Sequence, residues 1–301
     1  MIQITIRQME YFEALARTRH FGRAAESAGV SQPALSAQIA EMEQRLGCRL
    51  FDRSSRGISL TEKGLELAPE VERILGEIRS LEAMGGLKRN AMEGRLRLGI
   101  IPTVAPYLLP VVLPALKRRY PALHLELREA VTTVLLEEVL GGRLDGLIAA
   151  TPLDAPALTV EELFHDRFFL AVPRSDPAFV TPPVAPESVA LERLMLLEEG
   201  HCMREQALAV CGRVRPAVMA NYGATSLTTL MQMVAHGLGV TLIPEIAVSS
   251  ASEMRDLRIL PFADPVPERT LCVAWRRNAP RGEDCMELAR FVRQIGLPAK
   301  A

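Results

Sequence analysis

The sequence lacks the features that mark membrane, secreted and metal-binding proteins. No run of about eighteen apolar residues occurs in its 301 residues, so we expect no membrane-spanning helix. Residues 1–7 lack the hydrophobic segment of a signal peptide, which indicates a cytoplasmic chain and argues against a secreted solute-binding protein. Five scattered cysteines do not form a disulfide framework, and no Cys/His spacing indicates zinc. We therefore expect no metal and no other cofactor.

An excess of charge of either sign is also missing. The net charge is −1, and residues 1–65 carry nine Lys/Arg against seven Asp/Glu, a difference of +2. Nucleic-acid binding must therefore be argued from the pattern of residues rather than from overall charge. The hydrophobic content of 49% and the charged content of 24% are typical of a soluble protein, and the length leaves room for two or three domains.

The N-terminal residues predict a helix-turn-helix. Helical patterns cover residues 7–17, 21–28 and 32–46, and the second helix stops at a glycine turn. Ser31 and Pro33 begin the third helix as its N-cap and as a residue of its first turn. The residues expected on the buried face of this helix are Leu35, Ile39, Met42 and Leu46.

We expect the third helix and the hairpin after it, a wing around residues 54–57, to contact DNA. Small polar side chains at the start of the helix can read base edges, and arginines of the hairpin can bind phosphates. The alternative is a plain three-helix packing unit whose polar positions are only solvated. The expected DNA-binding residues are Ser31, Gln32, Pro33, Ser36, Gln38, Arg53 and Arg56.

A long helix follows over residues 62–84, with Thr61 as its cap. Its apolar residues recur at steps of four and three, which is a heptad seam. Dimerisation through this seam would present two helix-turn-helix units to two half-sites of DNA. The alternative is that the seam packs against the chain's own core. The seam residues are Leu67, Val71, Ile74, Ile78 and Leu81.

Beyond a hinge at residues 85–94, strands and helices alternate in the order that predicts a parallel sheet. The expected elements of this first lobe are strands at 95–100, 123–128 and 144–149 and helices at 108–120 and 134–140. A second lobe begins after a crossing near Leu163, with elements at 168–172, 194–197, 203–210, 214–219, 226–236 and 240–243. Residues 271–275 and 286–295 are expected to return to the first lobe.

The predicted fold is an α/β regulatory domain of two Rossmann-like lobes, like that of periplasmic binding proteins, preceded by a winged helix-turn-helix and a linker helix. Ligands of such sheets bind beyond the carboxyl ends of the strands, at the lobe boundary. The expected domains are residues 1–61 (DNA binding), 62–90 (linker and hinge), 91–164 with 268–301 (lobe I) and 165–267 (lobe II).

Cys202 and Cys211 stand at the two ends of a predicted helix in lobe II. Cys202 lies at a strand-to-helix junction, where free backbone N–H groups and the helix dipole favour a thiolate. A helix of nine steps holds the two Cα atoms roughly 13 Å apart. A disulfide requires about 7 Å or less, so the pair can bond only if the helix unwinds. The alternative is that both cysteines are small buried hydrophobic residues.

Several motifs resemble those of the LysR-type transcriptional regulators. Residues 99–104 and 106–110, and residues 200–207 with Cys211, are similar to the peroxide-sensing members of that family. The resemblance runs along nearly all of the chain. Its N-terminal motifs are Phe21-Gly22-Arg23-Ala24-Ala25, Val30-Ser31-Gln32-Pro33-Ala34-Leu35-Ser36, Leu46-Gly47, Leu50-Phe51-Asp52-Arg53 and Leu60-Thr61-Glu62-Lys63-Gly64.

The resemblance implies a regulator that senses hydrogen peroxide and controls antioxidant genes, rather than an enzyme. Cys202 would be the peroxidatic thiol, oxidised to a sulfenic acid, and Cys211 the resolving thiol that forms the disulfide. For two threonines of this set, Thr103 and Thr132, helix capping is the alternative interpretation. The residues implied to hold or polarise peroxide are Thr103, Thr132, His201 and Arg204.

The implied partners are operator DNA, hydrogen peroxide, RNA polymerase and a reductant of the glutaredoxin or thioredoxin type. A homodimer through the linker helix and four subunits on one operator are also implied, with a cytoplasmic location that is nucleoid-associated on DNA. Cys48, Cys272 and Cys285 are interpreted as packing residues. Two competing functions are a LysR-type regulator with a small organic effector between the lobes and a thiol peroxidase.

Overall fold

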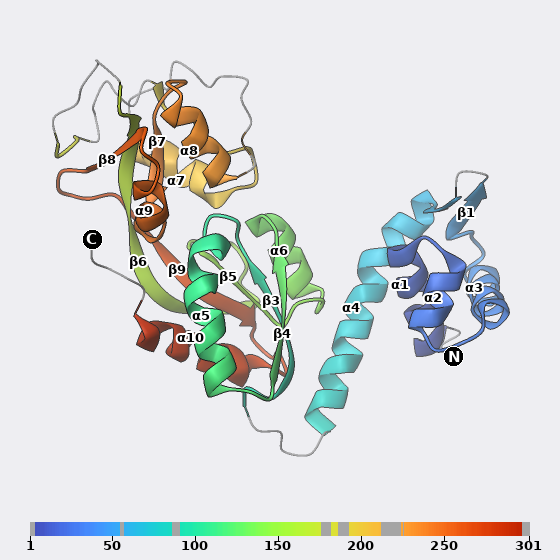
Figure 1. The fold of residues 1–301 in the computed structure, drawn as a ribbon. Coiled ribbons are helices and arrows are strands. Elements are labelled where there is room, and N and C mark those ends of the chain that lie inside the picture. Colours follow the sequence, from blue (N-terminus) through green and yellow to red (C-terminus); the bar gives the residue numbers. More distant parts are fainter. Residues whose placement is uncertain are drawn as a thin grey trace. The chain divides into compact units, whose positions relative to one another are not determined.

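The computed structural model divides into two compact units (Figure 1). No helix in the described ranges is long and apolar enough to cross a membrane. The described residues are 4–54, 57–85, 91–175, 182–185, 193–211, 224 and 226–296. The units comprise Met1–Leu87 with Leu140–Arg143, and Lys88–Val139 with Leu144–Ala301.

In its described residues the N-terminal unit has four helices and a two-stranded hairpin, and the fourth helix is the linker. The Ser31 hydroxyl accepts a hydrogen bond from the Ala34 backbone N–H at 3.4 Å, which makes Ser31 the predicted cap of the third helix. Leu35, Ile39 and Met42 are buried as expected, but Leu46 is 38% exposed because it lies in the last turn of its helix, past the packed face. The elements are α1 (Ile6–Thr18), α2 (Phe21–Ser27), α3 (Gln32–Leu46), β1 (Phe51–Ser54) and β2 (Gly57–Leu60).

The linker helix α4 spans Glu62–Gly85. The Thr61 hydroxyl caps it by accepting a hydrogen bond from the Gly64 backbone N–H at 3.0 Å. Of the seam residues, Val71 is buried in the hydrophobic core shared with α1 to α3, Leu67 and Ile78 pack against that core, and Leu81 is 69% exposed. Much of the predicted seam therefore packs on the chain's own core, because α4 lies against α1. Dimerisation through the rest of the seam stays a prediction.

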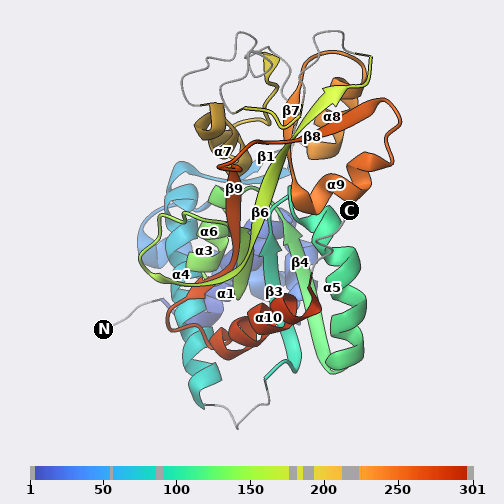
Figure 2. The same ribbon diagram turned by 90° about the vertical axis from the view of Figure 1, so that its left-hand side faces the viewer.

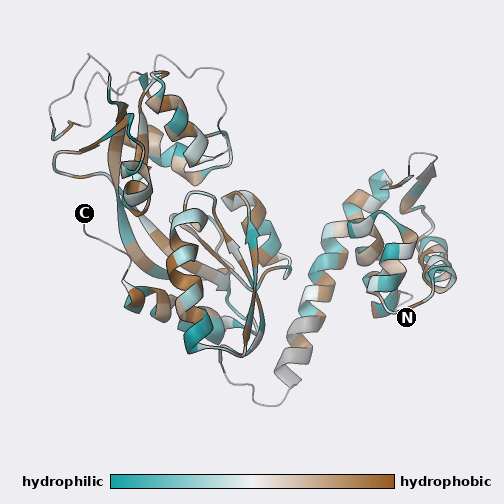
Figure 3. Ribbon diagram, in the orientation of Figure 1, coloured by the Kyte–Doolittle hydropathy of each residue, from teal (hydrophilic) through white to brown (hydrophobic). Residues whose placement is uncertain are grey.

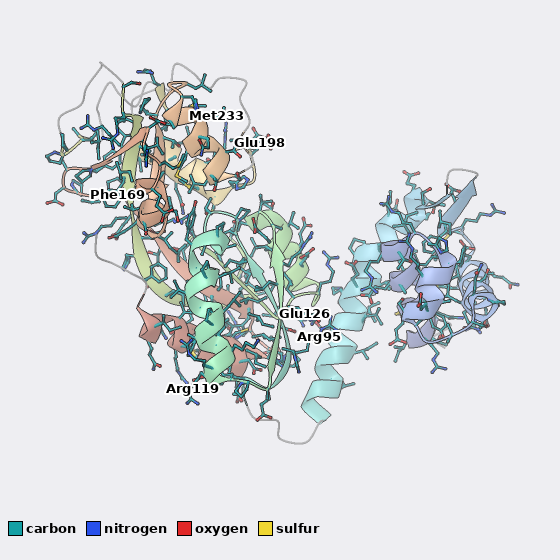
Figure 4. All side chains as sticks on the ribbon, in the orientation of Figure 1. Arg95, Arg119, Glu126, Phe169, Glu198 and Met233 are labelled. Carbon is teal, nitrogen blue, oxygen red and sulfur yellow. The ribbon has the colours of Figure 1, made fainter. Side chains whose placement is uncertain are left out.

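A parallel sheet with two connecting helices begins the C-terminal unit. Strand β5 is buried at all five positions, as expected for a strand covered on both faces. Arg95 and Glu126 pair across the neighbouring strands β3 and β4, with 2.6 Å between Nε and Oε1 (Figure 4). The elements are β3 (Gly94–Ile100), α5 (Ala105–Arg119), β4 (Leu123–Glu129), α6 (Thr132–Leu140) and β5 (Gly146–Ala150).

Two long antiparallel strands, β6 (Leu158–Pro173) and β9 (Glu268–Arg276), run side by side between the two lobes of the C-terminal unit (Figures 1 and 2). The described sheet has the order β4-β3-β5-β9-β6-β7, with β8 also paired to β6. The first part of β6 pairs with β9 in lobe I, and its last part pairs with β7 (Thr241–Pro244) and β8 (Leu257–Pro261) in lobe II. Each lobe has its own hydrophobic core, and hydrophobic residues gather on the strands (Figure 3).

The helices of lobe II cover its strands, and α10 (Gly282–Ile295) returns to lobe I as predicted. The two-lobe α/β architecture is confirmed. The predicted strand at 194–197 is wrong, because this buried stretch makes only isolated bridges, from Leu194 to Val240 and from Leu197 to Ala224. The prediction at 214–219 and residues 86–90 of the predicted hinge lie outside the described residues. The lobe II helices are α7 (Cys202–Cys211), α8 (Leu227–Ala235) and α9 (Glu245–Ser252).

Candidate functional site

The N-terminal end of α7 lies against lobe I at the boundary between the lobes. Gly200 precedes the helix with φ of +91°, a conformation that favours glycine. A Cβ atom at Gly200 would stand 3.4 Å from Cγ2 of Val131, so this turn packs on the loop that follows β4. Cys202 is a free, half-buried cysteine that packs against the hydrophobic core of lobe I. The predicted helix thus begins at the cysteine and faces the carboxyl ends of the lobe I strands.

Thr103, after β3, is held by a buried ion pair. Nη1 of Arg269 donates to the Thr103 hydroxyl at 2.9 Å, and Nη2 donates to its backbone carbonyl at 3.3 Å. Nε and Nη2 of Arg269 also donate to Oδ2 of Asp166, at 2.9 and 2.8 Å. The other Asp166 oxygen accepts the backbone N–H of Ile246, at the start of α9 in lobe II. One hydrogen-bonded network therefore joins the two lobes beside the site.

The two threonines are not helix caps. Val104 is the N-cap residue of α5 and has no side-chain cap, while the Thr103 hydroxyl accepts from Arg269. The Thr132 hydroxyl oxygen is buried at the start of α6 and has no hydrogen-bond partner within the described part of the chain. Buried polar atoms are normally satisfied. Thr132 thus offers an unused donor and acceptor at the edge of lobe I.

His201 and Arg204 flank the cysteine. His201 is 7% exposed, and burial lowers the pKa of its imidazole, against a smaller opposing effect of the Glu198 carboxylate (Glu198 is labelled in Figure 4). Arg204 is half-buried and donates through Nη1 to the backbone carbonyl of Leu197 at 3.0 Å. The site therefore combines a neutral imidazole with a fixed guanidinium charge.

The remaining cysteines differ in accessibility. Cys211 ends α7, and its side chain lies outside the described residues. Burial raises the pKa of the Cys272 thiol to about 12 and raises the pKa of Cys285 even further, so neither is ionised near neutral pH. Cys48 is half-buried in the N-terminal unit. Among the described residues no cluster of His, Cys, Asp and Glu is placed to hold a metal ion.

The predicted DNA-binding residues fall partly within the described chain. Ser31, Gln32 and Pro33 are exposed at the start of α3, and Ser36 is half-buried one turn on. Gln38 is half-buried and donates from Nε2 to Glu41 at 3.1 Å, so its amide is already engaged. The Arg53 side chain and the whole of Arg56 lie outside the described residues.

Sequence reasoning missed three polar residues at the lobe boundary. Arg269 and Asp166 form the buried pair described above, and Gln206 of α7 contacts lobe I through the backbone carbonyl of Thr151. Arg269 stands two residues before the predicted buried strand 271–275, and the antiparallel pairing of β9 with β5 brings this amino end beside the carboxyl end of β5. The only sequence feature that could have singled out Arg269 is its charge immediately before an apolar strand. That feature does not identify Thr103 as its hydrogen-bond partner.

Two family descriptions match the chain. Residues 6–65 match the bacterial regulatory helix-turn-helix protein of the lysR family, and residues 89–296 match the LysR substrate binding domain. The chain belongs to the LysR family. Both parts of this LysR-family regulator correspond to the units seen in the structure, a helix-turn-helix and a two-lobe α/β domain.

Relatives of this LysR-family regulator include peroxide-responsive proteins. It is 39% identical to the hydrogen peroxide-inducible genes activator of Pectobacterium carotovorum, over 97% of this chain and 96% of that protein. A full-length OxyR variant from Pseudomonas aeruginosa is 32% identical with a TM-score of 0.80, covering 98% and 99% of the two chains. A hydrogen-peroxide-bound cysteine mutant of Corynebacterium glutamicum OxyR is 30% identical with a TM-score of 0.64, covering 98% and 95%.

Proposed function

We propose that this chain is a hydrogen peroxide-sensing, DNA-binding transcriptional regulator that is switched by a disulfide between Cys202 and Cys211. The observation that carries the proposal is the position of Cys202. It is a free cysteine at the start of α7, it packs against lobe I, and the helix ends at Cys211. Similarity to OxyR proteins over nearly the whole chain supports the same function.

In the first step the Cys202 thiolate attacks one oxygen of hydrogen peroxide. An S–O bond forms and the O–O bond breaks, so that sulfur is oxidised to a sulfenic acid while the second oxygen leaves as hydroxide and takes up a proton. In the second step the Cys211 thiol attacks the Cys202 sulfur. The S–S bond forms as the S–O bond breaks, and the sulfenic oxygen leaves as water.

Four residues would bind or polarise the peroxide. The Thr132 hydroxyl has no hydrogen-bond partner among the described residues, and the Thr103 hydroxyl, which accepts from Arg269, can direct its proton to a peroxide oxygen. His201 and Arg204 are neighbours of Cys202 along the chain, and in this proposal their hydrogen-bond donors and the positive charge of Arg204 stabilise the leaving hydroxide. The proposal thus assigns the two hydroxyl groups to peroxide binding and His201 and Arg204 to stabilisation of the leaving oxygen.

Oxidation would reach DNA through a change in how subunits are arranged. The Cys202 and Cys211 Cα atoms lie about 13 Å apart on an intact helix, so the disulfide requires α7 to unwind. We propose a homodimer that uses exposed residues of α4, among them Leu65 and Leu81, and a homotetramer on operator DNA. RNA polymerase is the proposed downstream partner, and a glutaredoxin- or thioredoxin-type protein the reductant.

The deciding experiment is a peptide-mass map of the reduced full-length protein after about one equivalent of hydrogen peroxide. The expected product is a Cys202–Cys211 linkage, with Cys272 and Cys285 still reduced because burial keeps both thiols protonated. Cys202→Ser should form no linkage and should bind operator DNA equally with and without peroxide. Cys211→Ser should stop at a sulfenic acid that dimedone traps.

Free thiols at both positions after peroxide treatment would contradict the redox switch. A regulator that responds to a small organic effector between the lobes would then become the better description. An unchanged peroxide response in Cys202→Ser would equally remove Cys202 from its role. Folding of each variant can be checked by its circular dichroism and by its melting temperature, since serine is close in size to cysteine.

A further inference from the structure

The helix that carries the sensing cysteine has two faces with different attachments. Met203 and Ala207 are buried in the hydrophobic core of lobe II, and Val210 packs against the same core. Cys202 instead packs against the core of lobe I. Gln206 lies four residues after Cys202, which places it on the same helix face, one turn along. Cys202 and Gln206 thus form the lobe I face of α7.

Gln206 makes a hydrogen bond across the lobe boundary. Its Nε2 donates to the backbone carbonyl of Thr151 at 3.3 Å. Thr151 directly follows β5 and is itself fixed, because its N–H donates to the Thr270 carbonyl of β9 at 2.9 Å and its hydroxyl contacts the same oxygen at 3.4 Å. The acceptor is therefore a rigid part of lobe I, while the donor belongs to the helix that must rearrange.

The other end of the Gln206 amide is unsatisfied. Its Oε1 is buried and has no hydrogen-bond partner among the residues that the structure describes. A buried acceptor without a partner loses its interaction with water at a free-energy cost, and it regains that interaction when the side chain is released. The stabilisation that the hydrogen bond to Thr151 provides is therefore offset in part by the desolvation cost of Oε1. The result is an attachment that is specific in geometry but weak enough to open.

The structure assigns Gln206 as a positioning residue: we propose that its bond to Thr151 holds the first turns of α7 on lobe I and slows the joining of Cys202 to Cys211. The inference rests on the proposed redox function. Gln206 lies between the two cysteines, so the bond must break when the segment unwinds. Oxidation of Cys202 by peroxide needs no unwinding. The bond therefore slows the second step and leaves the first unchanged.

The test compares Gln206→Leu and Gln206→Glu with the reduced full-length wild type. Leucine is similar in size and helix propensity but cannot donate, and a carboxylate cannot donate and repels the Thr151 carbonyl. Stopped-flow mixing with peroxide, with dimedone trapping and mass analysis at timed intervals, separates sulfenic acid formation from disulfide formation. We expect disulfide formation to be about three- to tenfold faster, and sulfenic acid formation unchanged within about twofold.

Glu205→Gln is the matched control, since Glu205 is exposed and immediately precedes Gln206 in α7. It should leave both rates as in the wild type. An unaltered disulfide rate in both Gln206 variants would overturn the proposal. A tenfold loss in the sulfenic acid step would also overturn it, because Gln206 would then act on peroxide itself.

A second measurement tests the attachment without redox chemistry. Amide hydrogen exchange over residues 203–210 of the reduced protein should be about three- to tenfold faster in Gln206→Leu than in wild type or Glu205→Gln. Equal amide exchange in all three proteins would overturn the proposal, even if the proteins differed in their rates of disulfide formation. If wild type formed no Cys202–Cys211 linkage, the proposed redox function would fail, whereas the exchange comparison would still test the Gln206 attachment.

Discussion

Arg269 and Asp166 are almost completely removed from water, with side chains 0% and 1% exposed. Such a pair is tolerable only when its remaining hydrogen-bonding groups are satisfied, because desolvation of two charges is costly. Here the Ile246 N–H and the Thr103 hydroxyl and carbonyl complete the network. The pair therefore fixes the Thr103 hydroxyl at one place on the edge of lobe I, where a small polar ligand needs a rigid partner.

The histidine beside the cysteine should make stability depend on pH. Burial lowers the pKa of His201 in the folded protein, so the unfolded chain binds its proton first as the pH falls below about 6.5. The free energy of unfolding should therefore decrease as the pH falls from about 6.5 through the lower folded pKa. Denaturant titrations between pH 7.5 and 5 should show a shallower decrease for His201→Asn than for wild type.

His124→Asn provides the control for that comparison, because it removes a histidine that is exposed on β4. Its pH dependence should match that of wild type. If the free energy of unfolding depended on pH identically in wild type and His201→Asn, burial of the His201 imidazole would not contribute to that dependence. Other titratable groups would then account for the slope.

The elements were largely predictable, whereas the contacts between distant residues were not. Local periodicity and capping predicted α3, α4 and α7, since each signal lies within a few residues. The buried stretch at 194–197 reads as a strand by composition, yet the described chain gives it only single bridges. The bond from Arg269 to Thr103 joins residues 166 positions apart, and no local pattern specifies such a partner. Site residues close to a sequence motif could therefore be proposed from the sequence. The distant residues that hold them in place through hydrogen bonds could not.

The junction between the wing and α4 depends on a glycine. A Cβ atom at Gly64 would overlap the Leu50 backbone carbonyl oxygen and stand 2.9 Å from Cδ2 of Leu60. Backbone cannot yield as easily as a side chain, so Gly64→Ala should reduce the free energy of unfolding of the N-terminal unit by about 1–3 kcal/mol. Thermal denaturation of the full chain measures this. Glu66→Ala, at a neighbouring exposed position whose only described ion pair is the exposed one with Lys63, should change it little.

The residues proposed to read DNA and those proposed to sense peroxide lie in separate units of the molecule, and substitutions in the two sets should therefore act independently. Gln32→Ala should weaken operator binding about five- to a hundredfold, by the same factor in the reduced and oxidised proteins. The slope of log affinity against log salt should not change, because glutamine neutralises no phosphate. Fluorescence anisotropy over a salt series gives both quantities.

Gln44→Ala is the comparison variant, since Gln44 is also exposed on α3 but lies near the end of the helix. It should bind as wild type does. Unaltered affinity of Gln32→Ala would argue against the start of α3 as the reading surface. If Gln32→Ala lowered operator affinity by different factors in the reduced and oxidised proteins, oxidation would change the contacts between Gln32 and the bases.

The placement of β9 between β5 and β6 has a consequence for how the chain is made. The ribosome delivers β5 more than a hundred residues before the strand that must lie beside it. Until residue 276 has emerged, lobe I has an open sheet edge and an uncovered apolar face, while the residues of lobe II are already available to fold. A nascent chain can therefore aggregate through this sheet edge and apolar face until late in translation. Chaperone binding would be most useful at that stage.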